Sequence, residues 1–271
     1  QETSPRAGAS GVVSGGGGGE FYSHQIANSV RFNKSASDFF TRTPGSAGNR
    51  RTWTWSCWFK KSLLGNLGND GVIFGADAND GGSNFFQIRL NQSNAPIDGF
   101  SVTGSSVQIN YAPLLRDTSA YYHFVVAVDT TQGTSTNRVK FYLNGTQVTT
   151  TTYAAYPGLN YDSTVNNTTE HQIGELRYNG STILNGYMAE MVLIDGTALG
   201  PDSFGETKNG VWIPKDPSGL TFGTNGTYLN FAASGDLGND VSGNNNDWAN
   251  NGIAAHDQML DSPTFNSDSN G

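Results

Sequence analysis

The segment from Ala120 to Thr150 constrains the fold more than any other part of this chain. It contains two stretches, YHFVVAVD and VKFYL, in which apolar side chains alternate between two faces. Alternation with a period of two is typical of half-buried antiparallel strands. The dipeptide Asn144-Gly145 follows the second stretch and predicts a tight type I′ hairpin turn, because both central positions of that turn need a positive φ. The segment therefore predicts an antiparallel β fold, but the same pattern suits a lectin, a hydrolase or an adhesin equally.

The composition supports this fold class and argues against two others. Hydrophobic residues make up 35% and charged residues 14% of the 271 positions, and Gly, Asn, Ser and Thr make up the difference. Fifteen Phe, eleven Tyr and five Trp are enough to fill a core, so a disordered chain is not expected. Runs of Ala, Leu, Glu and Lys at helical spacing are missing, which argues against a helical bundle.

Further strands are predicted on both sides of this segment. The stretch RTWTWSCWFKK places Trp53, Trp55, Cys57 and Phe59 on one face of a strand. The stretch SVRFNKSASDFFTRT is predicted to form a first strand pair. Short strands separated by turn residues are also expected at GVIFGA, FFQIRL, GFSVTG, SVQINY, HQIGEL, GYMAEMVLID and GTYLNFAAS.

The order of these segments predicts the architecture. Residues 201–208, PDSFGETK, carry the best signal for a short helix, with Asp202 as a candidate cap. Many short strands without intervening helices predict an all-β, antiparallel two-sheet jelly-roll sandwich. We expect one domain over residues 20–271, including an Asp/Asn-rich C-terminal segment, after a flexible Gly-rich arm at residues 1–19. The arm has no core of its own, so its deletion is expected to leave a folded protein that no longer assembles.

Charge and hydropathy exclude two kinds of partner. The formal net charge is −8 and the pI about 4.8, whereas a surface that binds phosphates needs the opposite sign, so nucleic acid is not an expected partner. No stretch approaches the ~20 apolar residues of a membrane span. The first ten residues, QETSPRAGAS, contain no apolar signal core.

The single cysteine and the four histidines form no recognisable catalytic or metal-binding motif. Cys57 lies between aromatic residues and is predicted to be a buried structural thiol, since a nucleophile would need a histidine partner and an electropositive pocket. His123 opens a strand and is predicted to be a structural hydrogen-bonding residue. No two histidines have the spacing of metal ligands. A Ser-His-Asp arrangement stays open, although no GxSxG motif supports it.

Five motifs follow one another in a fixed order over about residues 28–200, and each is weak on its own. In chain order they are the aromatic strand TWTWSCWFKK, Tyr122-His123-Phe124, Tyr142-Leu143-Asn144-Gly145, Ile173-Gly174 and Gly186-Tyr187-Met188-Ala189-Glu190-Met191. This ordered set resembles the concanavalin A-like, laminin G-like jelly-roll superfamily. The resemblance implies a lectin-like sandwich.

Two flanking stretches carry a second pattern, EFYSHQIANSVRF near the start and GDLGNDVSGNNNDWANNGIAAHDQMLDSP near the end. They resemble structural proteins of marine tailed bacteriophages. This resemblance implies a fibre, tail or capsid decoration protein at the virion surface, outside the cell. Its implied partners are other virion proteins and further copies of the chain, with a trimer favoured because viral fibres are commonly trimeric.

The carboxylates do not follow the pattern of glycosidases on this fold, which place two acids together, usually as Glu-x-Asp-x-x-Glu on one strand. None of the six glutamates has that spacing. Glu190 and Asp195 are an odd number of residues apart, so they are expected on opposite faces of their strand. We therefore expect no enzyme, although carboxylates from separate strands can still meet.

Three clusters of acidic and amide side chains are candidate calcium sites, because Ca²⁺ prefers carboxylate and amide oxygens. The first consists of Asp77, Asn79 and Asp80. The second lies within residues 236–240, and the third combines Asp162 with residues 166–167. The competing interpretation is that these residues form Asx turns, in which the side chain bonds the local backbone.

One polar loop is a candidate glycan site. Sugar recognition combines an exposed aromatic ring with Asp or Asn side chains that bond hydroxyl groups. The candidates are Tyr153, Tyr156, Tyr161, Asp162 and Asn166. They predict a module or adhesin that binds a host surface glycan, with calcium as its candidate cofactor. The alternative is that the tyrosines pack the loop onto the sheet.

Overall fold

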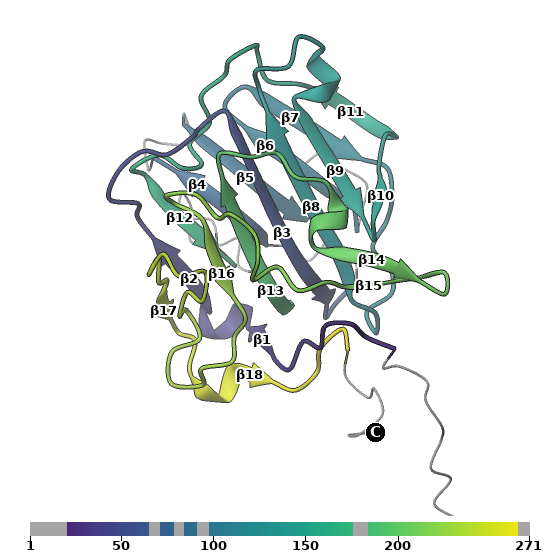
Figure 1. Cartoon of the computed structure of the whole chain (residues 1–271), viewed down its shortest axis with the longest axis vertical. Coiled ribbons are helices and arrows are strands. Elements are labelled where there is room, and N and C mark those ends of the chain that lie inside the picture. Colours follow the sequence, from purple (N-terminus) through teal and green to yellow (C-terminus); the bar gives the residue numbers. More distant parts are fainter. Residues whose placement is uncertain (1–20, 65–70, 79–83, 91–97, 176–183, 265–271) are drawn as a thin grey trace, which may run out of the picture.

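The computed structural model describes residues 21–64, 71–78, 84–90, 98–175 and 184–264. Two antiparallel sheets pack face to face as a sandwich (Figure 1). In the described residues each sheet has eight strands. The predicted all-β jelly-roll class is confirmed.

The first sheet contains the central hairpin segment. Its order is β10-β9-β8-β3-β13-β1-β18, and β16 also pairs with β13. Its strands are β1 (Ser29–Phe32), β3 (Thr52–Lys61), β8 (Tyr122–Asp129), β9 (Val139–Leu143), β10 (Thr146–Gln147), β13 (Gly186–Asp195), β16 (Thr227–Leu229) and β18 (Gln258–Met259).

The second sheet has the order β11-β7-β6-β5-β4-β12-β2-β17. Its strands are β2 (Phe39–Arg42), β4 (Val72–Asp77), β5 (Phe85–Leu90), β6 (Phe100–Gly104), β7 (Val107–Tyr111), β11 (Thr151–Ala155), β12 (Glu170–Ile173) and β17 (Ala249–Asn251).

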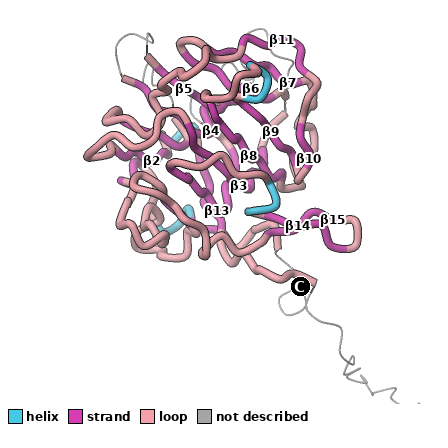
Figure 2. The backbone as a smooth tube through the Cα atoms, turned by 45° about the horizontal axis from the view of Figure 1, so that its top comes forward, coloured by secondary structure: helices cyan, strands magenta, loops and turns pink. Residues whose placement is uncertain are grey.

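Little of the described chain is helical, as Figure 2 shows. A small hairpin of β14 (Gly205–Lys208) and β15 (Val211–Pro214) lies beside the first sheet. Four 3₁₀ turns complete the described elements: η1 (Lys34–Ala36), η2 (Ser135–Asn137), η3 (Pro201–Ser203) and η4 (Ala255–Asp257). None of the described helices is long and apolar enough to cross a membrane.

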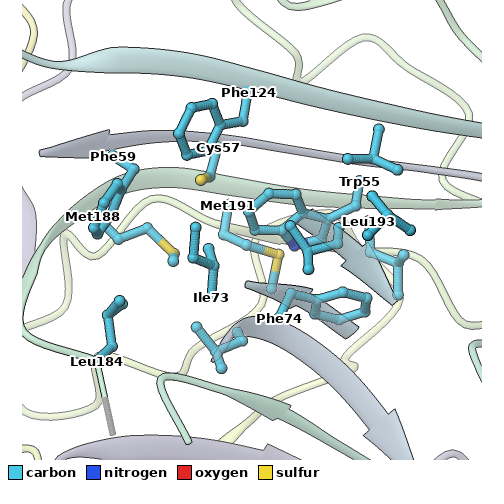
Figure 3. Close-up of a cluster of buried hydrophobic side chains, with 14 of the residues drawn as sticks. Trp55, Cys57, Phe59, Ile73, Phe74, Phe124, Leu184, Met188, Met191 and Leu193 are labelled. Atoms are coloured by element: carbon cyan, nitrogen blue, oxygen red, sulfur yellow. The ribbon is translucent and has the colours of Figure 1, made fainter. Parts of the chain in front are cut away.

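The core lies between the two sheets, as strand alternation predicts. Trp55, Cys57 and Phe59 project from β3 and are fully buried. Phe74 of the second sheet stacks on Trp55 at 5.6 Å between ring centroids (Figure 3). Each large buried aromatic side chain removes a large apolar area from water, which is the main favourable term in folding.

The predicted hairpin turn is confirmed. Asn144 and Gly145 have φ values of 47° and 79°, as a type I′ turn requires. A Cβ atom at Gly145 would lie 2.4 Å from the Trp212 ring, so this position needs glycine for space as well as for its φ.

Cys57 is buried, as predicted, and burial raises the pKa of its thiol well above the ordinary value. The thiolate is the reactive form, so this thiol is protected chemically as well as sterically. We expect no labelling of the native protein by a disulfide exchange reagent at pH 8 and one equivalent of labelling in denaturant. Rapid labelling of the native protein would contradict this prediction.

The predicted first strand pair is wrong. β1 pairs with β13 and β18 in the first sheet, and β2 pairs with β12 and β17 in the second. The short turn η1, followed by Ser37 in the left-handed region, carries the chain from one sheet to the other. Alternation along each strand is satisfied because Phe32 and Phe40 enter the same core from opposite sheets.

The predicted helix over residues 201–208 is also wrong. Only Pro201–Ser203 is helical, and the following residues form β14. Gly205 lies against the Trp212 ring, where a Cβ atom would approach within 2.4 Å. This packing favours the extended hairpin over continuation of a helix.

Candidate functional site

The outer face of the second sheet is polar. In β5, β6 and β7 the apolar side chains enter the core, so the alternate residues point to the other side. We call this surface the polar face. Its buried polar residues are Asp77 at the end of β4 together with Gln87, Arg89, Ser101, Thr103, Asn110 and Gln172.

Strand register arranges part of the polar face into one row. Arg89 of β5 lies opposite Ser101 of β6, and Ser101 lies opposite Asn110 of β7. Asn110 in turn lies opposite Tyr153 of β11. Directly opposed residues have Cβ atoms about 4.5–5.5 Å apart, so neighbours along this row can contact one ligand. We call these four residues the Arg89 row.

The Arg89 row contains polar atoms that lack hydrogen-bond partners. Ser101 Oγ, Arg89 Nε and both polar side-chain atoms of Asn110 are buried without a partner among the described residues. Ser101 and Asn110 are 0% exposed, and Arg89 is 8% exposed. Native proteins leave few such groups, and those that occur together are expected to meet water or a ligand. The clustering of these atoms on three adjacent strands identifies the row as the candidate site.

A second row runs beside the first and ends in an open groove. It passes from Thr103 through Gln87, Gly75 and Gln172 to Thr41 on β2. At Thr41 a polar groove of about 510 Å³ opens, lined also by Arg42, Thr43, Gly45, Glu170, Asn245, Asn246, Asp247 and Ala249. Polar groups thus extend across most of the sheet.

The predicted glycan residues do not form one surface. Tyr153 is 52% exposed and belongs to the Arg89 row. Tyr156 packs against the core, and burial raises the pKa of the Tyr161 phenol. Asp162 forms a bidentate ion pair with Arg51, with N–O distances of 2.8 and 3.2 Å. Of these four residues, Tyr153 has the exposure that a stacking residue needs.

The placement of Asn166 differs from the expectation of a surface contact. Asn166 is fully buried and has a positive φ of 62°. Its side-chain nitrogen donates to the Asn49 carbonyl at 3.0 Å and to Asp195 Oδ1 at 3.1 Å. Its backbone nitrogen donates to His171 Nε2 at 2.9 Å. Asn166 therefore connects loops inside the protein. Its amide bonds the Asn49 carbonyl, a backbone group that is not paired within a sheet.

Residues 33–203 match the family described as the concanavalin A-like lectin/glucanases superfamily. The chain belongs to this superfamily. The match covers most strands of both sheets, including the polar face and the central hairpin, and leaves out β1, β16, β17 and β18. It confirms the family predicted from the ordered motifs.

Several solved structures align with the chain at low identity. The mouse laminin α1 domains LG4-5 align with a TM-score of 0.45 and 9% identity over 67% of this chain and 45% of that chain. A heptameric SAP-like pentraxin from Limulus polyphemus aligns with a TM-score of 0.43 and 14% identity, over 65% and 80% of the two chains. The enzymatically active domain of tailspike protein 2 from bacteriophage CBA120 gives 0.38 and 9%, over 65% and 28%. No functional property follows from similarities of this size, and the curated proteins contain no match to this chain.

The predicted calcium clusters differ in what the structure describes. Asp77 is buried at the end of β4, whereas Asn79 and Asp80 lie outside the described residues. Asp240 accepts hydrogen bonds from the backbone nitrogens of Tyr228, Ser242 and Asn246, as in the Asx-turn interpretation. Within the described ranges, His, Cys, Asp and Glu form no group of three that suits a metal ion.

Glu190 and Asp195 are held in separate hydrogen-bond networks. Glu190 accepts from Tyr228 in the hydrophobic cluster outside the first sheet, whereas Asp195 accepts from Asn49 and Asn225 at the end of β13. They do not form the carboxylate pair of a glycosidase.

His123 is a structural residue, as predicted. Trp212 Nε1 donates to His123 Nδ1 at 3.0 Å, so in the neutral ring the proton is on Nε2, which contacts Ser56 Oγ at 2.9 Å. Burial lowers the pKa of His123 to about 3. An Nε2 that already carries a proton cannot accept one from Ser56, so this pair is not a nucleophile with its base.

The Arg89 row is not predicted from the sequence, although the alternation that places its polar residues on one face is present there. FFQIRL, FSVTG and VQINY alternate apolar and polar residues, and the polar positions are Gln, Arg, Ser, Thr and Asn without Glu or Asp. Alternation assigned the apolar residues to the core. Register, which brings Arg89, Ser101 and Asn110 into line, depends on strand pairing that sequence periodicity does not give.

Proposed function

We propose that this chain is a non-enzymatic glycan-binding protein whose ligand lies on the Arg89 row. The observation that carries the proposal is Asn110, a buried amide with an unpartnered donor and an unpartnered acceptor. A carboxamide can donate to one sugar hydroxyl and accept from another. Tyr153, in the adjacent register position, is exposed and supplies a ring for stacking.

The experiment compares the wild type with Asn110→Ala on a glycan array, followed by calorimetry with the best ligand. We expect the dissociation constant to rise at least tenfold, because the variant leaves ligand hydroxyls unpaired. The melting temperature is expected to stay the same or to rise, since the replaced amide makes no side-chain hydrogen bond within the described protein. Asn137→Ala, at an exposed position in η2, is the matched control.

Two results would contradict the proposal. One is the absence of any bound glycan, with or without calcium. The other is equal affinity of the wild type and Asn110→Ala. Hydrolysis of the bound glycan would contradict the non-enzymatic part alone, which is supported by the separate networks around Glu190 and Asp195.

We further propose that the binding domain belongs to a virion surface protein that assembles through its N-terminal arm. The support is the sequence resemblance of the flanking segments, and the trimeric state remains a prediction. The test is assembly of the 271-residue protein compared with a variant that lacks residues 1–19, measured by mass in solution and by incorporation into particles. Unchanged assembly of the shortened protein would contradict this role for the arm.

A further inference from the structure

We propose that the glycan bound on the polar face carries an anionic group, a carboxylate or a sulfate, that pairs with Arg89. The inference rests on the proposed function and specifies its ligand. It starts from a charged side chain that is 8% exposed on the outer face of β5. Burial lowers the pKa of this guanidinium, and arginine nevertheless stays protonated in proteins.

Other cations in the described part of the chain show what is unusual about Arg89. Lys61 is the other Lys or Arg classed as buried there, and its ammonium bonds Asp98 Oδ1 at 2.5 Å. Arg31 pairs with Asp257 at 2.9 Å. Arg89 has no ion pair with a described carboxylate. Removing a charge from water without a counter-charge is costly, so an unpaired buried arginine indicates a missing anion.

Asp77 is the acid that β4, the neighbouring strand, places on the same face. It lies too far from Arg89 to supply that anion. Val72 lies opposite Arg89, and Asp77 lies opposite Phe85 at the other end of the β4–β5 pair. At about 3.3 Å per residue, the four-residue offset between Arg89 and Phe85 separates Asp77 from Arg89 by about 13 Å along the strands. Arg89 has no ion pair within the described part of the chain, and we assign the anion to the ligand.

The rest of the row defines what surrounds that anionic group. Ser101 and Asn110 are the next two residues across the sheet, at strand spacings of about 4.8 Å. Their unpartnered oxygen and nitrogen atoms suit hydroxyl groups of the same or the next sugar ring. A neutral glycan would satisfy Ser101 and Asn110 but would leave Arg89 buried and unpaired.

The negative net charge of the chain argues against unspecific binding of an acidic glycan. At −8 the protein repels polyanions at long range, so an acidic glycan is selected only where a local cation outweighs that repulsion. Ser101 and Asn110 are 0% exposed, so Arg89 and Tyr153 are the members of the row that solvent reaches.

The test uses matched pairs of oligosaccharides that differ in charge. Oligogalacturonate is compared with oligogalactose, and sulfated galactan with the same galactan after desulfation. We expect at least tenfold tighter binding of one acidic member than of its neutral partner. We also expect Arg89→Gln to abolish this preference, with Arg116→Gln at an exposed position as the control.

The outcomes separate the two proposals. Equal or tighter binding of neutral glycans, weakened by Asn110→Ala, overturns the anionic inference and leaves the glycan-binding function in place. No binding of any glycan overturns both. Acidic preference retained in Arg89→Gln overturns the role of Arg89. If Arg89→Gln does not fold, Arg89→Lys keeps the charge without the bidentate geometry, and an unchanged affinity of that variant contradicts bidentate pairing of the anion with the guanidinium.

Discussion

Replacing Asp195 with alanine is expected to lower the free energy of unfolding by about 3–5 kcal/mol, the range for loss of a buried, hydrogen-bonded charge. Asp195 is 8% exposed at the end of β13. Its carboxylate accepts from the backbone nitrogens of Asn49 at 2.7 Å and Asn225 at 3.0 Å, and from the Asn166 amide at 3.1 Å. These donors come from three loops distant in sequence, so the alanine variant leaves all three without their common acceptor.

Urea unfolding followed by tryptophan fluorescence measures the effect. Asp202→Ala is the control, because Asp202 is exposed in η3 and is expected to change stability by less than about 0.5 kcal/mol. Asp195→Asn keeps the shape but supplies one carbonyl acceptor instead of two carboxylate oxygens, so an intermediate loss is expected. A loss below about 1 kcal/mol for Asp195→Ala would show that water satisfies these donors and that the network does not hold the loops.

Periodicity and turn chemistry predicted the sandwich because they act within a few residues. The alternation in β8 and β9 and the Asn144-Gly145 turn are local properties, and the structure confirms both. The separation of β1 from β2 was not predictable in this way. Whether two neighbouring strands pair or enter opposite sheets depends on partners such as β13 and β12, more than 100 residues away in sequence.

The candidate site shows the same limit. Composition predicts Tyr153 as a residue that stacks on a sugar, and it does lie in the Arg89 row. The same argument predicts Asn166 as a sugar contact, yet Asn166 is buried in the Asp195 network. Composition identifies residue types that can bind a sugar or cap a loop, and only strand register and burial separate these roles.

Glu190 forms a buried contact that holds residues 21–28, which precede β1, against the first sheet. It lies at a register shift in β13 with a φ of 47°, a strained value for a residue with a side chain. Its Oε1 accepts from Tyr228 Oη at 2.7 Å and contacts His24 Nε2 at 2.5 Å. The neighbouring Ser23 donates to Glu206 at 2.5 Å.

The stability supplied by His24 is expected to depend on pH. The hydrogen bond with Glu190 is the main cause that raises the pKa of His24 above its ordinary value of 6.5, and the charges of Glu190 and Asp216 add to it against partial burial. The folded-state pKa is thus above the unfolded one. The stabilisation is therefore complete below about pH 6.5 and is lost as the pH rises through the folded-state pKa.

We expect the wild type to exceed His24→Gln in free energy of unfolding by about 1–2 kcal/mol at pH 6, because His24 is partly exposed and its ion pair is partly screened. At pH 9 a neutral imidazole protonated on Nε2 still donates to Glu190 but no longer supplies a charge. The difference should therefore fall by at least half. Urea unfolding of both proteins at the two pH values measures it, and His256→Gln, at an exposed histidine, is the control.

Subtracting the variant from the wild type at each pH removes the titrations that the two proteins share, including those of Asp216 and the other carboxylates. A difference that stays constant from pH 6 to pH 9 would mean that His24 acts through packing or through a neutral hydrogen bond alone. A difference that grows with pH would reverse the sign of the linkage and rule out a raised pKa of His24 in the folded state. Only a difference in free energy of unfolding that falls with rising pH shows that the charged His24–Glu190 pair holds residues 21–28 in place.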